Sequence, residues 1–391
     1  MTTPSQAEEL IRGQVLSLDE EFISIHQALN RILSEDLLAD SDLPPFNRVM
    51  MDGIALNYQA IASGIRSFPI QAMQRAGEAP LELENKEHCI EIMTGAVCSY
   101  GCDTVVPYEH IRMENGMAHI EVVPNSAGKN VHLKGSDKPV GEVLAAKGKR
   151  IGPAEIGIAA SIGKDILKVM RLPRVLICST GDELVEIHAT PLAHQIRRSN
   201  VYALRSSFQR LGIEANEIHL PDETELLRSA LRSALSSYDV IVLSGGVSKG
   251  KFDLLPEVLS ELGVITVFHG IEQRPGKPMW FGHSPSCVVF ALPGNPVSTM
   301  ACAARYVMPW FVAQMGLPSQ TGWVTTAAVP TAHEKLSLFV PVSIEFSQTE
   351  KVAHLLSHQG SGDFSALSGM DGFLEVPAGS SHAENYRYFP L

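Results

Sequence analysis

Cysteine is scarce in this sequence of 391 residues. Six cysteines are too few for a disulfide scaffold in a chain of this length, so we expect free thiols and a cytoplasmic protein. Cys98 and Cys102 are separated by three residues, but no second pair and no nearby histidine accompanies them, which disfavours a zinc site. The cysteines are Cys89, Cys98, Cys102, Cys178, Cys287 and Cys302.

Positively charged residues are also fewer than negatively charged ones. Lysine and arginine total 31 against 43 aspartates and glutamates, so the formal net charge is −12. An acidic surface repels polyanions, which argues against a nucleic-acid partner and against adsorption to a membrane. No apolar run approaches the roughly 18 residues of a membrane span, and the polar N-terminus predicts no secretory leader. The hydrophobic share of 45% predicts an ordinary folded core, in roughly two to four domains.

The first part of the chain changes character at a pair of prolines. Residues 5–14 and 23–40 carry apolar side chains at helical spacing, and we predict a helix over each. Pro44 and Pro45 cannot continue a helix, so they mark a hinge into a new domain. From 46 to 135, short apolar segments alternate with turn residues, which predicts a small β-rich domain.

Strands and helices alternate in the second half of the chain. Residues 141–163 predict a strand, a turn and a helix that begins near Pro153. Beyond residue 172 the alternation predicts a doubly wound, mainly parallel α/β domain of about 150 residues. After Trp323 the helical pattern is lost, which predicts a β-rich C-terminal domain. The alternating segments are 174–180, 199–212, 223–237, 239–246, 256–263, 264–271, 287–296 and 297–315.

Four glycine- or proline-rich turns follow predicted strands of this α/β domain. They are STGDEL (179–184), SGGVSKGKFD (244–253), RPGKP (274–278) and LPGNP (292–296). In an open α/β sheet, ligands bind outside the carboxyl ends of the strands. Such turns bring backbone N–H groups together without crowding, which suits a phosphate or another oxyanion, and Arg274 and Lys277 add positive charge. One such turn is usually structural, but four in one domain favour an anion-binding site.

The carboxylates near these turns have competing interpretations. Asp182 and Glu183 either cap the next segment or bind a ligand. Asp253 ends a glycine-rich loop, where a metal or substrate role fits. Asp222 and Glu225 have the spacing of a helix capping box, and spacing alone favours that interpretation. Because a divalent metal beside phosphates usually takes one or two protein carboxylates, Glu183 and Asp253 are the best candidates for metal ligands.

Two further motifs lie in the β-rich region. Asp52-Gly53, within MDGIA, is a strong turn signal and is most simply a hairpin. Thr94, within IMTGA, most simply ends a strand. From one chain alone, neither motif indicates a function.

Nine motifs taken in order resemble those of the MoeA family, the molybdopterin molybdenumtransferases, which are related to the C-terminal enzymatic domain of gephyrin. Single motifs are unspecific, but nine in a fixed order are highly specific, and they extend from about residue 7 to 380. They are PPFNRVMMDGIAL, IMTGAVCSYGCDTVVPYEH, GSDKPVGEVLAAKGKRIGPAEIGIAASIG, STGDEL, HQIRRSN, SGGVSKGKFD, RPGKP, LPGNPVS and QGSGDFSAL.

The resemblance implies an elongated homodimer whose chains each have four domains. These would be an α/β molybdopterin-binding domain with a mainly parallel sheet, a discontinuous linking domain, a β-rich domain carrying MDG and MTGA, and a C-terminal β-domain. In this family the site forms between subunits, so Asp52 and Thr94 would face the α/β domain of the partner chain. In that order, the domains would comprise residues 1–20 with 171–318, 21–44 with 136–170, 45–135, and 319–391.

The family reaction inserts molybdate into the dithiolene of adenylylated molybdopterin and releases AMP, usually with Mg²⁺, and a molybdopterin adenylyltransferase would supply the substrate. By resemblance, Glu183 and Asp253 would hold the metal. Asp222 would lie in the pyrophosphate or pterin pocket, which weakens the capping interpretation, and Ser361 would lie near the molybdate. Catalytic roles would fall to Asp52, Thr94, Glu183, Asp222 and Asp253. The remaining cofactor-binding residues would be Gly245, Gly246, Ser248, Arg274, Lys277, Pro293, Asn295 and Pro296.

The sequence departs from the family pattern at several positions. Pro341 stands where a basic residue is common, which puts the C-terminal share of molybdate binding in doubt. Residues 188–213 hold four arginines and no carboxylate. We therefore hypothesise that Arg197 and Arg198, which replace a usual tyrosine and aspartate, compensate for Pro341. The other departures are Asn47 for an acidic residue, the new Arg48, and Ser136 for the acidic neighbour of Asp137.

Three other interpretations stay open. The adenylyltransferase that precedes this reaction uses a similar α/β domain, although it is usually a single small domain. A non-catalytic carrier or scaffold need not retain Asp52, Glu183 and Asp253, and all three are present. A divergent paralogue could handle tungstate or lack activity.

Overall fold

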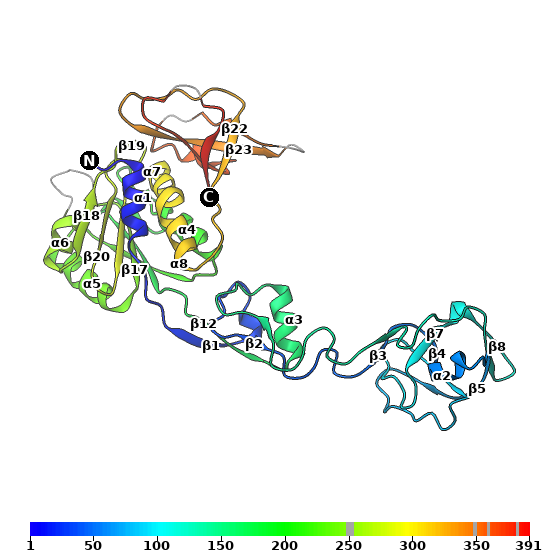
Figure 1. The fold of residues 1–391 in the computed structure, drawn as a ribbon. Helices are drawn as coiled ribbons and strands as arrows, with labels where there is room; N and C mark the ends of the chain where they lie inside the picture. The colour runs from blue at the N-terminus through cyan, green and yellow to red at the C-terminus, as the bar shows by residue number, and fades with distance from the viewer. Residues whose placement is uncertain (248–253, 347–349, 358–359, 381–382) are drawn as a thin grey trace. The chain divides into compact units, whose positions relative to one another are not determined.

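The computed structural model describes residues 1–247, 254–346, 350–357, 360–380 and 383–391 (Figure 1). The chain folds into two compact units, each with its own sheets and its own buried core. The first unit comprises Met1–Glu21, Asn30–Ile32 and Val169–Leu391, and the second comprises Phe22–Leu29 and Leu33–Lys168.

An α/β sheet forms the centre of the first unit. Among the described residues its strand order is β16-β13-β17-β21-β20-β18. The first four strands run parallel and β20 pairs antiparallel with β21 and β18, so the prediction of a mainly parallel sheet is confirmed. The strands β13, β17 and β21 are buried throughout, as expected for strands covered on both faces. The bounds are β13 Val175–Thr180, β16 Ala215–Leu220, β17 Val240–Ser244, β18 Ile265–His269, β20 Trp280–His283 and β21 Val288–Leu292.

Helices cover both faces of this sheet (Figure 1). Val175 and Ile177 share one core with α1, α4 and α8, whereas Leu176 and Cys178 share the other with α5 and α6. Successive residues of a strand point to opposite faces, so the helices α5 and α6 lie across the sheet from the others. The predicted helices that cover this sheet are thereby confirmed. Their bounds are α1 Pro4–Arg12, α4 Ser199–Gln209, α5 Thr224–Ser237, α6 Leu255–Glu261, α7 Pro296–Cys302 and α8 Met308–Gln314, with a π-helical turn at Ala303–Val307 between the last two.

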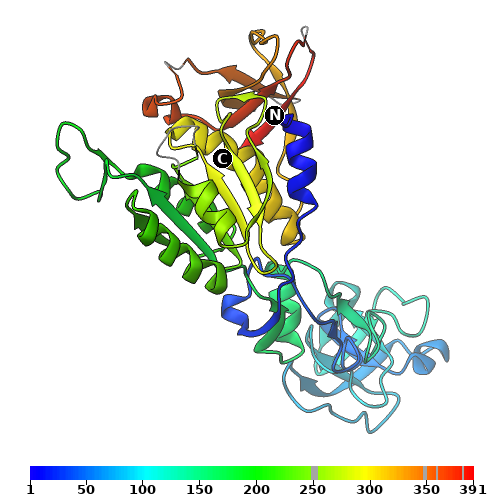
Figure 2. The same cartoon turned by 90° about the vertical axis from the view of Figure 1, so that its left-hand side faces the viewer.

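A second sheet of the first unit contains the predicted C-terminal β-region (Figure 2). In the part of the chain that the structure describes, its order is β19-β23-β24-β22-β26-β25, and β23 also pairs with β25. Val297 and Met300 of α7 pack against Phe339, Phe373 and Phe389 of this sheet. The sheet therefore docks on the helix that begins at the LPGNP turn. The bounds are β19 Gln273–Arg274, β22 Gly322–Thr326, β23 Ser337–Phe346, β24 Lys351–Leu355, β25 Gly372–Val376 and β26 Tyr386–Pro390.

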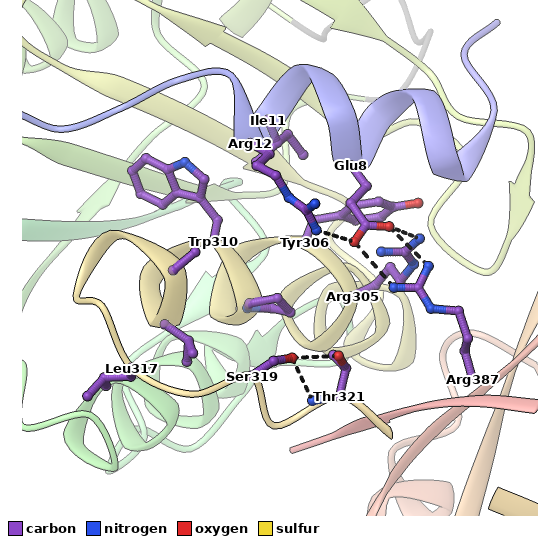
Figure 3. A pocket seen from close by; sticks show the side chains of 13 residues that line it. Glu8, Ile11, Arg12, Arg305, Tyr306, Trp310, Leu317, Ser319, Thr321 and Arg387 are labelled. Atoms are coloured by element: carbon purple, nitrogen blue, oxygen red, sulfur yellow. Dashed lines mark hydrogen bonds and ion pairs between the residues drawn. The ribbon is translucent and has the colours of Figure 1, made fainter. Parts of the chain in front are cut away.

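A cluster of ion pairs joins α1 to the π-helical turn and to β26 (Figure 3). Glu8 Oε2 accepts from Arg305 Nη2 at 2.8 Å and from Arg387 Nη1 at 3.1 Å, and Arg12 Nη2 lies 3.2 Å from Glu8 Oε1. Arg305 is 1% exposed, and its Nε lies 3.4 Å from Glu375 Oε2. Buried charges require such partners, so this cluster fixes the N-terminal helix to the C-terminal sheet.

The second unit contains the predicted β-rich region. Its principal sheet has the order β7-β4-β6-β5-β9-β8 within the described residues. Ile54 and Leu56 of β4 point into one core with Phe68, while Ala55 points into another with Ile92. The alternation in the sequence therefore reflects a sheet buried on both faces, and the prediction is confirmed. The bounds are β4 Gly53–Leu56, α2 Tyr58–Ala62, β5 Ser67–Gln74, β6 Cys89–Ile92, β7 Thr104–Pro107, β8 Ile111–Glu114 and β9 Met117–Ile120.

The predicted helix over residues 23–40 is wrong. The segment forms a 3-10 turn, η1 (Ile25–Gln27), and Asn30 then adopts a φ of 68°, which ends any right-handed helix. The backbone beyond this point pairs with distant parts of the chain: the N–H of Leu33 donates to the carbonyl of Lys149 at 2.9 Å. Non-local pairing therefore overrides the apolar spacing that predicted a helix.

Short elements complete the fold. The strand, turn and helix predicted over 141–163 are confirmed as β11 and α3. None of the helices that the structure describes has the length and apolar character needed to cross a bilayer. The remaining bounds are β1 Glu20–Ser24, β2 Leu37–Leu38, β3 Arg48–Val49, η2 Tyr108–His110, β10 Val131–His132, β11 Val143–Ala145, α3 Pro153–Ser161, β12 Ile166–Met170, β14 Leu184–Val185, β15 Ile196–Arg197 and η4 Phe364–Leu367.

Candidate active site

A cavity of about 800 Å³ lies at the carboxyl ends of the parallel strands. The strand β16 pairs on one side of β13, while β17 and β21 follow on the other, so the chain order reverses at β13. Loops diverge at such a switch point and leave a crevice, which is the usual ligand site of an open α/β sheet. The lining includes Ser179, Thr180, Gly181, Glu183, Arg197, Arg198, Asn200, Asp222, Ser244, Gly245, Gly246, Pro293, Asn295 and Pro296.

Two predicted glycines shape one wall of this cavity. Gly245 and Gly246 have φ values of 104° and 68°, a region that residues with a Cβ rarely adopt. A Cβ on either glycine would also lie about 3 Å from Oγ1 of Thr180. That hydroxyl is buried and has no hydrogen-bond partner among the described residues. The two glycines therefore let the loop pack directly against the Thr180 hydroxyl, and the N–H of Gly245 donates to the carbonyl of Leu292 at 3.0 Å.

Two predicted carboxylates line the same cavity, Glu183 and Asp222. The N–H of Asp222 donates to Asp182 Oδ1 at 3.2 Å, which links the loops after β13 and β16. The helix α5 takes Glu223 as its N-cap, one residue later than the capping box predicts. Predicted residues Ser248 and Asp253 lie outside the described residues.

The LPGNP turn lines the cavity through Pro293, Asn295 and Pro296 and lies beside the glycine loop, because β17 and β21 are neighbouring strands. Asn295 Nδ2 donates to Ser361 Oγ at 2.9 Å, so the predicted C-terminal residue reaches the rim of the cavity.

Asn200 was missed as a site residue, because its position at a helix start explained it fully. Its Nδ2 donates to Ser244 Oγ at 3.0 Å and to the Gly294 carbonyl at 2.7 Å, which ties two of the loops together.

The RPGKP turn follows β18 of the α/β sheet, as predicted. Its first residue belongs to β19, which pairs with β23 of the C-terminal sheet rather than with the α/β sheet. Arg274 and Lys277 are exposed, and both are outside the set of described residues that line the cavity, although Pro278 belongs to it. The turn therefore contributes Pro278 to the lining, whereas the cofactor-binding roles of Arg274 and Lys277 stay predictions.

Arg197 at the end of β15 and the adjacent Arg198, the N-cap of α4, have opposite environments. Arg198 is 8% exposed, and its guanidinium pairs with Glu186 at 2.9 Å and with Glu217 at 3.3 Å. Arg197 is exposed, and its Nε donates to the carbonyl of Ala189 at 3.1 Å. Both side chains line the cavity, but two carboxylates already neutralise Arg198.

The MDG and MTGA motifs meet in the second unit. Thr94 donates to Asp52 Oδ1 from its N–H at 2.6 Å and from its hydroxyl at 2.7 Å. The backbone hydrogen bond, and then the hydroxyl, lower the pKa of the exposed Asp52 carboxyl below its usual value. The strand β3 pairs with β10 and β4 pairs with β6 and β7, so the hairpin interpretation of Asp52-Gly53 is wrong.

Comparison with known proteins identifies the family. The models of the MoeA N-terminal region (domain I and II), a probable molybdopterin binding domain and the MoeA C-terminal region (domain IV) match residues 2–163, 176–312 and 325–385. A molybdopterin molybdenumtransferase of Synechocystis sp. is 37% identical over 100% of this chain and 99% of its own length. The chain belongs to the molybdopterin molybdenumtransferase (MoeA) family. The resemblance predicted from nine motifs is confirmed.

Other MoeA relatives agree with this assignment. A molybdopterin molybdenumtransferase of Synechococcus elongatus is 34% identical over 86% of each chain. The crystal structure of a molybdopterin biosynthesis MoeA protein from Pyrococcus horikosii is 28% identical, with a TM-score of 0.84, and covers 100% of this chain and 99% of that one. The multidomain MoeA fold predicted from the sequence is therefore confirmed, whereas the four domain boundaries stay predictions.

The cavity of this MoeA-family chain suits an anionic ligand. Backbone at Gly246 and the guanidinium of Arg197 supply hydrogen-bonding and positive groups to the lining. Glu183 and Asp222 add oxygen ligands of the kind that Mg²⁺ prefers. Among the described residues, no group of three or more histidine, cysteine or acidic side chains is arranged to hold a metal. The donor set therefore fits a metal shared between one or two carboxylates and a bound phosphate.

Proposed function

We propose that this protein inserts molybdate into adenylylated molybdopterin and releases AMP. The observation that carries the proposal is the cavity at the strand switch point, in a chain that matches MoeA-family transferases over its whole length. Its glycine loop, its hydroxyl groups and its arginine are chemically suited to phosphate and molybdate oxygens. The reaction needs two anions held together, so positioning and electrostatic stabilisation would supply most of the rate enhancement.

Mg²⁺ is part of this proposal. Glu183 would hold the ion beside the phosphates, with Asp222 within the same cavity and Asp253 as the second predicted ligand. When bound, the metal would offset negative charge on the phosphoanhydride that breaks. The residues of the chain would orient the substrate: the loop at Gly245 and Gly246 would receive phosphate oxygens, with Arg197 on the same cavity lining.

The proposal also includes a homodimer. Asp52 and Thr94 lie in the second unit, and we propose that they complete the cavity of a second copy of the chain. The Thr94 hydrogen bonds lower the pKa of Asp52 and hold its carboxylate in one orientation. A molybdopterin adenylyltransferase would supply the substrate. The cytoplasmic location remains a prediction.

Reconstitution tests the activity directly. Purified protein, adenylylated molybdopterin, MgCl₂ and molybdate should yield AMP and a cofactor that activates an apo-molybdoenzyme. Failure to release AMP would refute the proposal. ATP consumption with unadenylylated molybdopterin would instead identify an adenylyltransferase, and equal turnover with tungstate would show an enzyme without oxyanion selectivity.

Subunit complementation tests the shared site. Asp52→Ala and Glu183→Ala should each abolish turnover while the dimer stays folded. Mixing equal amounts under conditions that exchange subunits makes half the dimers heterodimers, each with one intact and one doubly altered site. Activity should then recover to about a quarter of wild type, because one site in four is intact. If the mixture stays inactive after exchange is shown by mass spectrometry, Asp52 and Glu183 act within the same chain.

A further inference from the structure

The cavity wall carries two neighbouring arginines of which only one is neutralised by the fold. Arg198 is buried and ion-paired with Glu186 and Glu217, neither of which lines the cavity. Its Cζ also lies 5.8 Å from the centre of the Tyr202 ring. A guanidinium held by two carboxylates and an aromatic face has little capacity left for a ligand. Arg198 is therefore a structural residue.

Arg197 has the complementary properties. It is exposed, lines the cavity, and forms no ion pair with any described carboxylate. The backbone beneath it is fixed, because β15 pairs with β14 in the register Leu184↔Ile196 and Val185↔Arg197. The hydrogen bond from Nε to the Ala189 carbonyl orients the side chain, and the terminal nitrogens have no hydrogen-bond partner among the described residues. These terminal N–H groups have the fork geometry that oxyanions bind.

The charge balance of the cavity makes this arginine important. Glu183 and Asp222 contribute negative charge to the lining, and the charge of Arg198 is cancelled by its partners. Among the described lining residues, Arg197 is then the one cation available to attract an anion. The protein as a whole carries a net charge of −12, so overall charge supplies no attraction.

We propose that Arg197 binds a tetrahedral oxyanion of the substrates in this cavity, while Arg198 only supports its position. This inference rests on the proposed function and revises the hypothesis that both arginines compensate for Pro341. The oxyanion is either the phosphate that leaves as AMP or molybdate, and both present the same arrangement of oxygens to a guanidinium.

Equilibrium binding distinguishes the two sources. Isothermal titration of the full-length protein with AMP, and separately with sodium molybdate, gives a Kd for each. Arg197→Ala should weaken binding of at least one by about tenfold or more, because a charge-assisted contact is lost. Arg197→Tyr, which restores the residue type usual in the family, should behave similarly, and Arg197→Lys should retain part of the affinity. Arg232→Ala removes an exposed arginine of α5 outside the cavity and should change neither Kd.

Each outcome has a defined meaning. Loss of AMP binding alone places Arg197 at the nucleotide phosphate, and loss of molybdate binding alone places it at the molybdate. If both Kd values match wild type while reconstituted turnover proceeds, the Arg197 proposal is refuted and the proposed function stands. If wild type binds the anions through Arg197 but never releases AMP on reconstitution, the proposed function fails and the anion site remains. If wild type binds neither anion, the Arg197 proposal is overturned.

Discussion

Replacement of Glu8 by glutamine should destabilise the first unit by about 3 kcal/mol at pH 7. Burial opposes ionisation of Glu8, but hydrogen bonds from Arg387 and the charge of Arg305 outweigh it and lower its pKa from 4.5 to about 2. At about 1.4 kcal/mol per pKa unit, that difference corresponds to about 3 kcal/mol of stabilisation. The Glu8 side chain is 23% exposed, so solvent screening reduces this value only modestly.

The sign of the pH dependence follows from the direction of the pKa change. The folded state lowers the pKa of Glu8, so its contribution is complete above pH 4.5 and disappears as the pH falls through about 2. The difference between wild type and Glu8→Gln should therefore shrink from about 3 kcal/mol at pH 7 to about 1.4 kcal/mol at pH 3.

Tryptophan fluorescence measures this unit selectively, because Trp280, Trp310 and Trp323 all lie in it. Urea titrations at pH 7 and pH 3 give the free energy of unfolding of each variant. Glu375→Gln is the matched control from the same cluster: burial raises the pKa of Glu375, so its ionisation contributes no stability that acid would remove. A Glu8→Gln protein as stable as wild type at pH 7, or equally destabilised at both pH values, would refute the reasoning.

Two further predictions concern the second unit. Gly53→Ala would place a Cβ 2.0 Å from the carbonyl oxygen of Val106, so hydrogen exchange should show that the free energy of unfolding of this unit falls by about 3 kcal/mol or more. The control Gly157→Ala, on an open face of α3, should cost no stability, and equal protection in both variants would contradict the packing argument. Thr94→Val removes one of the two hydrogen bonds to Asp52 and should raise the pKa of that carboxyl, so the acid limb of the kcat/KM profile should move to higher pH. If the pKa of Asp52 measured by ¹³C NMR titration is the same in both proteins, this prediction is wrong.

Much of the first unit could be predicted from the sequence. The strands β13, β17 and β21 begin as apolar runs and are followed within two residues by glycine, and the helix α5 has apolar residues at 3.6-residue spacing. Both signals are local. The carboxyl ends of parallel strands necessarily meet at one edge, so the position of Gly245 and Asn295 in one cavity followed from the topology.

The errors occur where non-local pairing decides the structure. Residues 23–40 have helical spacing, but hydrogen bonds to segments more than 100 residues away hold the backbone of Leu33. The RPGKP turn follows an apolar strand as predicted, but its first residue, Arg274, pairs with β23 of another sheet and is not among the described residues that line the cavity. Asp52-Gly53 has the composition of a hairpin, but glycine is needed there because β7 passes too close for a side chain.

An acidic protein can bind small anions because charge acts locally. At physiological ionic strength the Debye length is about 8 Å, so carboxylates elsewhere on the surface of a 391-residue chain are largely screened from the cavity. What a ligand meets there is the set of groups within a few ångströms, and the fold determines which of them remain unpaired. The contrast between Arg197 and Arg198 illustrates this: they are adjacent and chemically identical, yet Glu186 and Glu217 cancel only one of them. The sequence alone predicts the same role for both arginines, because only the fold shows that carboxylates pair with one of them and not with the other.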